Sequence, residues 1–491
     1  MCIERTDLCD RRGWNAMALV DRILRRVILT VVLSIGAQSV EALENSVPPH
    51  VAKRLVMCLD GTWRSAYDEA KRRDGHTVLK PANALKTCRA VVPYDETAGR
   101  AQIVYYHVGV GGLALYPGLS NRMLQRADRI LGGGWGAGFE ENVEGALHFL
   151  VLNIERGDEV FIFGFSRGAA IARAVTEFLD WNGGLPEKED AYYLPQLFRA
   201  YVLSRGAVGA QEQELAAINA DRQHEKRPLS PLKSFRPVRV KYLGVWDTVM
   251  ALGSRFEATG GGTSTAGRSF YAGTAPASCV ERARQALAID ERRFDFRPEI
   301  WTHRLEHQTM EQRWFAGVHS NVGGGYVNDG LANIAFHWVL DGAIDQGLKI
   351  DEEFVGFYRP FANDSLYDSY SVLYRTLDAL RGRAGSGERS LVDVPPGANL
   401  DLDPSVIARI QADPAALSRA SGDEPVTQPY RPENVLVFLA SQPDLGAYLR
   451  RIGVPDGEKV SLPDDVRRRI GELRSHSGTK TGTWRRAVVQ R

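Results

Sequence analysis

The stretch Val160-Phe-Ile-Phe-Gly164-Phe-Ser166-Arg-Gly168-Ala-Ala170 decides the fold of this chain. Its apolar start is too short for a core helix and is typical of a buried strand. A Gly-x-Ser-x-Gly motif follows, and the alanine-rich residues after it predict a helix. The two glycines allow a sharp turn and close packing of that helix on the strand. We therefore predict that Ser166 is a catalytic nucleophile at the carboxyl end of a strand; the alternative is an ordinary glycine-rich turn.

Strands and helices alternate on both sides of this motif. Alternation of this kind predicts a mostly parallel sheet with helices on both faces. The expected fold is an α/β-hydrolase-like sheet with helical insertions and a mainly helical or irregular C-terminal extension. Strands are expected at residues 54–59, 102–107, 238–245 and 313–318, and helices at 82–90, 139–153, 281–289 and 333–340.

A serine nucleophile needs a base and a group that orients the base, and in this fold the acid and the histidine follow the serine along the chain. Asp247 ends the strand expected at 238–245, and His319 directly follows the apolar run at 313–318. We therefore predict that His319 is the base and that Asp247 holds its tautomer. The alternatives are a helix cap or loop acid for Asp247 and an ordinary loop histidine for His319.

An oxyanion hole needs two backbone N–H donors. The residue after the nucleophile, Arg167, is expected to supply one of them. Gly61, in the loop after the first strand, is the candidate for the second because glycine allows the backbone to approach an acyl oxygen. The loop Val108–Gly112 is the competing candidate.

We expect neither a metal nor an organic cofactor, because the two candidate motifs in the sequence are not convincing. His303-Arg-Leu-Glu-His307 matches the H-x-x-E-H zinc motif, but its flanks are charged and no third ligand is evident, so an exposed helix is expected. The glycines at 132–138 lack dinucleotide-binding spacing. The 61 basic and 60 acidic residues leave a formal charge of +1, which does not favour nucleic-acid binding.

The N-terminus has the order of a secretory signal. Arg25-Arg26 precede the apolar run Val27–Ala37, and Val40-Glu-Ala42 offers a cleavage site. We predict that residues 1–42 are a signal peptide, which would export the protein to the periplasm or the medium. The alternatives are an N-terminal membrane anchor or, with a different start such as Met17, a cytoplasmic protein.

The remaining boundaries follow from composition. Residues 52–345 form the expected catalytic domain, and residues 346–475 form the C-terminal extension, in which 385–396 reads as a linker or exposed loop. The basic tail at 476–491 is expected to be disordered. Residues 185–236 and 253–275 are candidate lids that could open at a membrane surface. The sequence does not indicate an oligomeric state.

Four motifs in order resemble one family: Leu59-Asp-Gly-Thr-Trp63, Gly157-Asp-Glu-Val-Phe-Ile-Phe-Gly-Phe-Ser-Arg-Gly-Ala169, Leu243-Gly-Val-Trp-Asp-Thr-Val249 and Trp314-Phe-Ala-Gly-Val-His-Ser-Asn-Val-Gly-Gly-Gly-Tyr326. They resemble the catalytic domain of type VI secretion phospholipase effectors of the first lipase family, and Ala288-Ile-Asp290-Glu-Arg-Arg293 also fits. The resemblance covers residues 52 to 345. Asn321 stands where the family commonly has Asp.

The resemblance implies a phospholipase A-type serine hydrolase, with the catalytic triad on Ser166, Asp247 and His319 and with no cofactor. The expected substrate is an acyl ester of phospholipid or a similar lipid. Two alternatives remain open from the sequence: a carboxylesterase for non-lipid esters, and a catalytically silent protein that keeps the hydrolase fold for binding. Acyl-chain length and positional specificity cannot be derived from the sequence.

Overall fold

The structure is a computed structural model of residues 1–491. It describes residues 51–61, 69–71, 76–109, 135–224, 231–232, 235–250, 272–370, 372–380, 387–412, 415–418, 426–454 and 462–477. Everything below refers to these residues, which belong to one compact unit from Ala52 onward. The predicted signal peptide at residues 1–42 lies outside them, as does the tail from residue 478.

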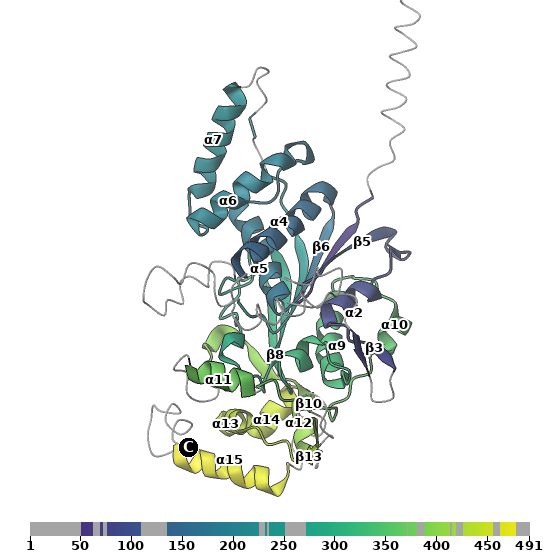
Figure 1. The fold of residues 1–491 in the computed structure, drawn as a ribbon, viewed down its shortest axis with the longest axis vertical. Helices are drawn as coiled ribbons and strands as arrows, with labels where there is room; N and C mark the ends of the chain where they lie inside the picture. Colours follow the sequence, from purple (N-terminus) through teal and green to yellow (C-terminus); the bar gives the residue numbers. More distant parts are fainter. Residues whose placement is uncertain are drawn as a thin grey trace, which may run out of the picture. The chain divides into compact units, whose positions relative to one another are not determined.

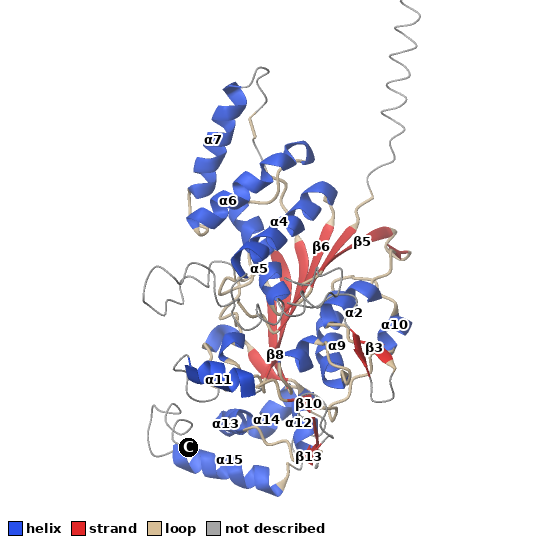
Figure 2. Cartoon of the chain, in the orientation of Figure 1, coloured by secondary structure: helices blue, strands red, loops and turns tan. Residues whose placement is uncertain are grey.

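An eight-stranded sheet forms the centre of this unit (Figure 2). Its strand order is β11-β9-β8-β7-β6-β1-β5-β4, and every pairing is parallel except that of β4 with β5. The predicted fold class is confirmed. The strands are β1 (Arg54–Leu59), β4 (Tyr94–Asp95), β5 (Arg100–His107), β6 (Glu159–Phe165), β7 (Val240–Trp246), β8 (Val280–Ala288), β9 (Thr309–Phe315) and β11 (Leu400–Leu402).

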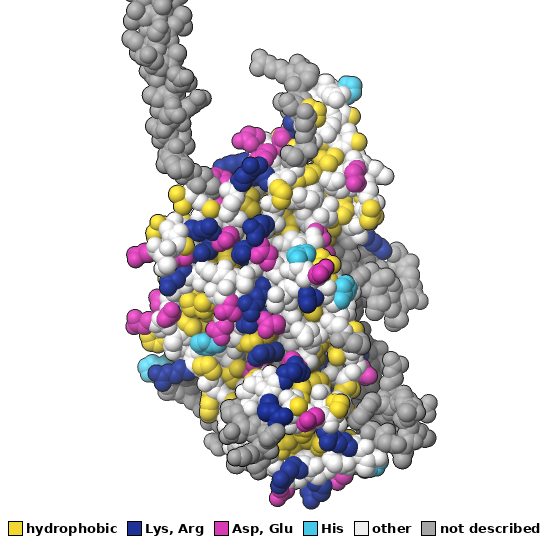
Figure 3. Space-filling view, turned by 180° about the vertical axis from the view of Figure 1, so that it is seen from behind, with side chains coloured by type: hydrophobic (Ala, Val, Ile, Leu, Met, Phe, Trp, Pro, Cys, Tyr) yellow, Lys and Arg dark blue, Asp and Glu magenta, His cyan; other side chains and the backbone are white. Residues whose placement is uncertain are grey.

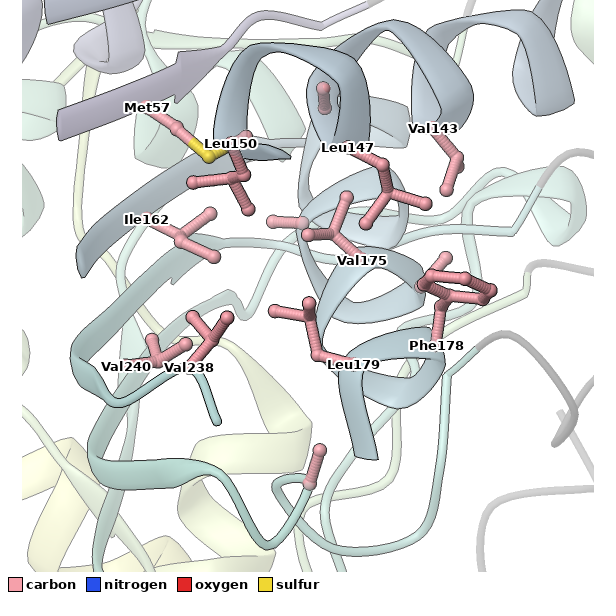
Figure 4. Packing of buried hydrophobic residues seen from close by; sticks show 14 of the residues in the cluster. Met57, Val143, Leu147, Leu150, Ile162, Val175, Phe178, Leu179, Val238 and Val240 are labelled. Atoms are coloured by element: carbon pink, nitrogen blue, oxygen red, sulfur yellow. The ribbon is translucent and has the colours of Figure 1, made fainter. Parts of the chain in front are cut away.

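Helices cover both faces of the sheet (Figure 1). On one face lie α4 (Trp135–Asn153) and α5 (Arg167–Asn182), and on the other lie α2 (Asn83–Ala90) and α9 (Gly330–Ile344). Successive residues of a strand point to opposite faces, so a strand covered on both faces must be apolar throughout. In β1, Met57 packs with α4 and α5, whereas its neighbour Cys58 packs with α2 and α9 (Figure 4 shows the first of these clusters).

The segment at 281–289 corrects the sequence prediction, because it is the central strand β8 and not a helix. Its alanines, arginines and glutamine favour a helix in isolation, but tertiary pairing overrides such local preferences. Arg284 lies opposite Glu311 of β9 and bonds its carboxylate at 2.8 Å, and Gln285 lies opposite Gln312 and bonds its side chain at 2.9 Å. These in-register partners satisfy polar groups that a buried strand would otherwise leave unpaired.

Residues after 345 join the same sheet. Strand β11 pairs in parallel with β9, and the helices that follow it form a shared apolar core with Leu287 and Trp314 of the sheet. These helices are α12 (Pro404–Gln411), α13 (Glu433–Ser441), α14 (Leu445–Arg451) and α15 (Asp464–Ser477). The other elements of this part are α10 (Glu352–Gly356), β10 (Leu366–Tyr367), α11 (Val372–Leu380), η5 (Pro396–Ala398), β12 (Ala415–Ser418) and β13 (Val426–Gln428).

The first candidate lid, at 185–236, contains η1 (Lys188–Tyr193), α6 (Leu194–Ser204) and α7 (Ala210–His224). It packs through Phe198 and Tyr201 against Phe178, near the end of α5. Arg236 ties its base to α4 through the carbonyl of Ile154. Phe178 lies 12 residues after Ser166, about 18 Å along α5, and the insertion would have to extend over this distance to cover Ser166. Most of the second candidate, at 253–275, lies outside the described residues.

The surface mixes charges of both signs. Lys and Arg side chains are interspersed with Asp and Glu over the face shown in Figure 3. Within the described ranges, none of the helices combines the length and apolar character that crossing a bilayer requires.

Two short strands, β2 (Glu69–Lys71) and β3 (Thr77–Leu79), form a separate antiparallel pair, and η4 (Phe294–Phe296) follows β8.

Candidate active site

Ser166 lies on a strained turn between β6 and α5. Its backbone angles are φ 58° and ψ −120°, a left-handed conformation that is costly for a residue with a side chain. The turn is tight enough to require both glycines of the motif. A Cβ at Gly164 would lie 2.5 Å from the carbonyl oxygen of Gly168, and a Cβ at Gly168 would lie 2.1 Å from that of Leu59. The predicted strand, turn and helix are thus present.

The turn lies where the strand order reverses. The chain leaves β1 by α2 on one face and leaves β6 by α5 on the other, and ligands in open α/β sheets bind in the crevice at such a switch point. Gly61, after β1, reaches this place: a Cβ added to it would lie 3.3 Å from Ser166 Cβ. Ser166 is 5% exposed, so the crevice is narrow in this conformation.

Asp247 and His319 form a hydrogen-bonded pair at the same edge of the sheet. Asp247 follows β7, the neighbour of β6, and His319 begins α8 (His319–Gly323) shortly after β9. The Nδ1 atom of His319 lies 2.6 Å from Asp247 Oδ2. Since an ionised carboxylate only accepts, this geometry places the proton on Nδ1. The three predicted residues therefore all follow strands at their carboxyl ends.

The second ring nitrogen of His319 is free. Among the described residues, Nε2 is buried and has no hydrogen-bond partner. The ring lies between Phe165, with centroids 4.7 Å apart, and Phe296, at 4.9 Å. Burial is the main cause that lowers the pKa of His319 below its ordinary 6.5, although the hydrogen bond that His319 donates to Asp247 raises it in part. The imidazole is thus neutral at pH 7 and carries an unused lone pair next to the residue that precedes Ser166.

Besides His319, the carboxylate of Asp247 binds the N–H of Ala288, which donates to Oδ1 at 3.0 Å, and Arg389, which was not expected from the sequence. Its Nη1 lies 2.6 Å from Oδ1 of the carboxylate and its Nη2 lies 3.0 Å from Oδ2. Burial alone would raise the pKa of Asp247, but the charge of Arg389 and the bond to His319 lower it overall. Arg389 is 6% exposed, so the segment expected to be a linker or exposed loop at 385–396 places a buried arginine in the site.

Two acids after β8 hold the loop that carries His319. Asp290 accepts a hydrogen bond of 2.6 Å from the N–H of Gly317, and Glu291 accepts one of 3.2 Å from the N–H of His319. Glu291 also binds Arg293 through both carboxylate oxygens. The stretch 288–293 fitted the family resemblance, but local sequence gave it no role because Gly317 and His319, which it binds, lie in the segment after β9.

The glycine-rich loop after His319 is shaped by close contacts. A Cβ at Gly323 would lie 1.8 Å from the ring of Phe165, so only glycine lets α8 approach the elbow. Asn321 is buried, accepts from the N–H of Tyr367 at 3.2 Å and donates its Nδ2 to the carbonyl of Ser365 at 3.1 Å. An ionised Asp at this position could not make the second of these bonds.

The two predicted oxyanion donors are the backbone N–H groups of Arg167 and Gly61. Both residues are near Ser166, but the N–H of Gly61 already donates to another group. Arg167 directly follows Ser166 and is the first residue of α5, so its N–H lies at the start of a helix. The N–H of Gly61 donates to Oδ1 of Asp60 at 2.7 Å, and Tyr106 donates to the other oxygen of that carboxylate at 2.8 Å. For Gly61 to serve as an oxyanion donor, its N–H must break the hydrogen bond to Asp60 and donate to the substrate oxygen instead. Residues 110–112 of the competing loop lie outside the described residues.

The H-x-x-E-H stretch at 303–307 does not form the expected helix. It lies in a loop before β9, where His307 bonds the carbonyl of Ser278 at 2.9 Å and His303 bonds its neighbour Thr302. Within the described part of the chain, no group of three His, Cys, Asp or Glu side chains is arranged to hold a metal ion.

A mostly parallel sheet covered on both faces, with a serine on a left-handed strand-to-helix turn, places the protein among the α/β hydrolases. The chain belongs to the family described as "T6SS, Phospholipase effector Tle1-like, catalytic domain", whose model matches residues 53–342. The family resemblance seen in the sequence is thereby confirmed. Membership implies a hydrolase of lipid esters and suggests a secreted protein.

Other similar proteins are more distant. The uncharacterized protein YEL023C of Saccharomyces cerevisiae (strain ATCC 204508 / S288c) is 23% identical over 253 residues, which are 51% of this chain and 33% of the yeast protein. The chain thus spans about a third of that relative.

Two solved structures are similar. One is the crystal structure of an uncharacterized protein from Pseudomonas aeruginosa, with 15% identity and a TM-score of 0.33, covering 90% of this chain and 64% of that chain. The other is the Tle1 effector bound to the VgrG spike from the Type 6 secretion system, with 17% identity and a TM-score of 0.28, covering 57% and 52%. Because these TM-scores are low, the family assignment rests on the sequence match.

Proposed function

We propose that the protein is a serine hydrolase that cleaves carboxylic esters of phospholipids through Ser166, His319 and Asp247. One observation carries the proposal: the 2.6 Å bond from His319 Nδ1 to Asp247 fixes the tautomer whose Nε2 is an acceptor. That nitrogen is buried and unpaired among the described residues, and the His319 ring packs on Phe165, which precedes Ser166. General-base catalysis requires a neutral imidazole with a free lone pair, which could accept the proton of Ser166 when substrate binds.

The reaction proceeds in two halves. Ser166 Oγ attacks the ester carbonyl while His319 Nε2 takes its proton, and the tetrahedral intermediate collapses to an acyl-serine as His319 protonates the departing alcohol. Water then attacks the acyl-serine, again with His319 as base, and releases the carboxylic acid. Asp247 stabilises the imidazolium formed in each half. No cofactor takes part in these steps.

The developing oxyanion needs two donors. The N–H of Arg167 is the first, supported by its place at the start of α5 directly after Ser166. The N–H of Gly61 is the second, supported by its closeness to Ser166, and it becomes available when its bond to Asp60 opens. An Asp60→Asn variant tests this step: its weaker acceptor should release Gly61 without loss of kcat, and a loss above about ten-fold would speak against Gly61 as the donor.

A fluorophosphonate probe and a substrate panel test the proposal as a whole. The wild type should become labelled and should release fatty acid from phosphatidylcholine vesicles faster than it hydrolyses soluble short-chain esters. Ser166→Ala should remove both labelling and hydrolysis, while Ser441→Ala, at the end of α13, should change neither. A wild type that neither labels nor hydrolyses any ester would leave only a silent binding protein, and preference for soluble esters would favour the non-lipid carboxylesterase.

The segment 253–275 is proposed as the lid of this site. It follows β7 and Asp247 along the chain, and its described end is held against α5, where Arg173 donates to the carbonyls of Ala272 and Gly273. A lid predicts that activity on a short-chain ester rises when the ester forms aggregates. Deletion of residues 254–270 should remove that rise, and a full-length protein without any rise would contradict the lid.

Export by residues 1–42 is proposed from their sequence order alone. N-terminal sequencing of the protein recovered from the periplasm or the medium should begin after Ala42. A mature protein that retains the first residues would contradict cleavage.

A further inference from the structure

Arg389 makes a two-pronged contact with the carboxylate of Asp247. Its Nη1 donates to Oδ1 and its Nη2 donates to Oδ2, so the guanidinium and the carboxylate face each other. This fork-to-fork geometry fixes the orientation of a carboxylate more firmly than a single bond does. Asp247 Oδ2 is also the atom that accepts from His319. Arg389 therefore touches the group that orients the base, and the bonds of its guanidinium go to Asp247, Ala288 and Phe296 and not to Ser166.

The guanidinium is itself held on its other side. Nη1 donates to the carbonyl of Ala288 at 2.6 Å, and Nη2 donates to the carbonyl of Phe296. Ala288 ends β8, and Phe296 is the residue whose ring packs on the edge of His319. Arg389 thus binds three parts of the site: the carboxylate of Asp247 after β7, the end of β8, and the backbone of Phe296, whose ring packs on His319.

The backbone of Arg389 is anchored by the C-terminal helices. Asn434, in α13, donates its Nδ2 to the carbonyls of Arg389, at 3.1 Å, and Ile289, at 3.3 Å. One side chain therefore ties the segment that carries Arg389 to the end of β8. Both Arg389 and Asn434 lie outside residues 53–342, the part that matches the family model.

We propose that Arg389 is a positioning residue of the catalytic site, which locks Asp247 in the orientation that holds His319 and makes activity depend on the docked C-terminal extension. This inference rests on the proposed function of Ser166, Asp247 and His319. The functional unit is then larger than the family domain at residues 53–342, because Arg389, which lies beyond that domain, binds both oxygens of the Asp247 carboxylate.

The charge of Arg389 should also affect the pH dependence of activity, which gives the proposal a second measurable consequence. The arginine offsets the negative charge that Asp247 presents to the imidazole. Removing it leaves the carboxylate free to stabilise the imidazolium, so His319 would gain its proton at a higher pH. Other charges facing this cluster are Glu291, which favours the imidazolium, and Arg293, which opposes it, and both remain in an Arg389 variant. The acid limb of the activity profile should therefore move upward.

The experiment compares Arg389→Met and Arg389→Lys with Arg451→Met in the full chain. Arg451 makes a comparable two-pronged contact with Asp401, on β11, but at the surface and away from the site. For Arg389→Met, kcat on phosphatidylcholine should fall about ten-fold or more with KM nearly unchanged, and the acid limb should rise by about half a pH unit. Arg389→Lys should recover part of kcat, and Arg451→Met should match the wild type.

A double variant separates positioning from general structural damage. Because Arg389 acts through Asp247, adding Arg389→Met to Asp247→Asn should cost less than about two-fold beyond Asp247→Asn alone. Multiplying losses would overturn the proposal, as would a folded Arg389→Met protein with wild-type kcat and acid limb. If Arg389→Met does not fold, as judged by near-ultraviolet circular dichroism, Arg389→Lys decides by the same readouts.

Failure of this inference differs from failure of the proposed function. If Ser166→Ala abolishes hydrolysis while Arg389→Met leaves it intact, the serine mechanism stands and the positioning role falls. If Ser166→Ala retains the activity of the wild type, the proposed function falls first.

Discussion

Ser166 and Asp247 both have left-handed backbones, with φ of 58° and 44°, at the carboxyl ends of the paired strands β6 and β7. Non-glycine residues in this region are costly, and such strain gathers at functional sites. Only two other non-glycine residues of the described chain, Arg205 and Asn399, have positive φ. The sheet edge that we propose for catalysis is therefore also where the backbone stores strain.

The strained backbone of Ser166 should lower the free energy of unfolding when this position carries any residue with a Cβ. Ser166→Gly should be more stable than Ser166→Ala by about 1–3 kcal/mol, because glycine adopts φ 58° without penalty and both variants lack the hydroxyl. Urea unfolding measures the difference. At Ser475, in helix α15, the order should reverse, since glycine weakens a helix. Equal stability of the two Ser166 variants would show that the turn carries no strain.

The contact between Gly323 and Phe165 predicts that one methyl group disturbs the site. In Gly323→Ala the new Cβ needs the space of the Phe165 ring, so the protein should lose about 1–3 kcal/mol of stability, and kcat should fall because Phe165 also contacts His319. Gly471→Ala is the matched control, since a Cβ there meets no atom within 4 Å and should stabilise α15. Unchanged kcat in Gly323→Ala would contradict the close packing.

The buried imidazole predicts the acid limit of activity. Burial lowers the pKa of His319 below 6.5, so the midpoint of the acid limb of kcat/KM should lie below pH 6.5. Activity should then decline at lower pH as His319 gains a proton. A pH profile of kcat/KM, or of fluorophosphonate labelling, measures the midpoint. A midpoint above 6.5 would mean that the Asp247 interaction outweighs burial.

Glu291 predicts part of the acid sensitivity of the fold. Burial alone would raise its pKa, but Arg293 lowers it far below the ordinary 4.5. Its stabilising effect is therefore present above pH 4.5 and is lost as the pH falls toward the folded-state value. Glu291→Gln should lose about 3–5 kcal/mol at pH 7, because Arg293 loses its buried partner, and its stability should depend less on pH below 5.

The control for Glu291 is an ion pair at the surface. Glu433 pairs with Arg469 with both side chains more than a third exposed, so Glu433→Gln should stay within about 0.5 kcal/mol of the wild type. Urea unfolding at pH 7, 5 and 4 compares the variants. If both substitutions cost the same, the buried pair does not hold the His319 loop as described.

The clamp formed by Asn434 predicts a remote effect on catalysis. Asn434→Leu leaves the carbonyls of Arg389 and Ile289 without this donor and should lower both stability, by about 1–3 kcal/mol, and kcat. Asn219 ties Leu232 to α7 in a similar way, in the insertion between β6 and β7. Asn219→Leu should therefore lower stability alone. A normal kcat in Asn434→Leu would show that Arg389 keeps its place without the clamp.

The sequence was most informative where structure depends on neighbours along the chain. The apolar run before Ser166, the flanking glycines and the helix after them specify the elbow locally, and chain order then selected Asp247 and His319. The fold class followed from the same alternation of strands and helices and is confirmed. The catalytic roles of these residues stay predictions until the variants are measured.

The sequence was least informative where distant segments meet. Strand β8 has the composition of a helix, and its pairing with both β7 and β9 makes it a stable strand. Arg389 lies in a glycine-, arginine- and serine-rich stretch, and nothing near it in the sequence indicates its partner Asp247. Pairings of this kind depend on the tertiary fold, so local patterns do not reveal them.

The ion pair between Asp247 and Arg389 also sets an order of events in biosynthesis. The two residues are 142 positions apart, and a growing chain folds from its N-terminal side. While the polypeptide is still emerging from the ribosome, the elbow and β7 can form, but the aspartate has no arginine to face. The proposed site is thus completed only after Arg389 and the α13 segment have been made.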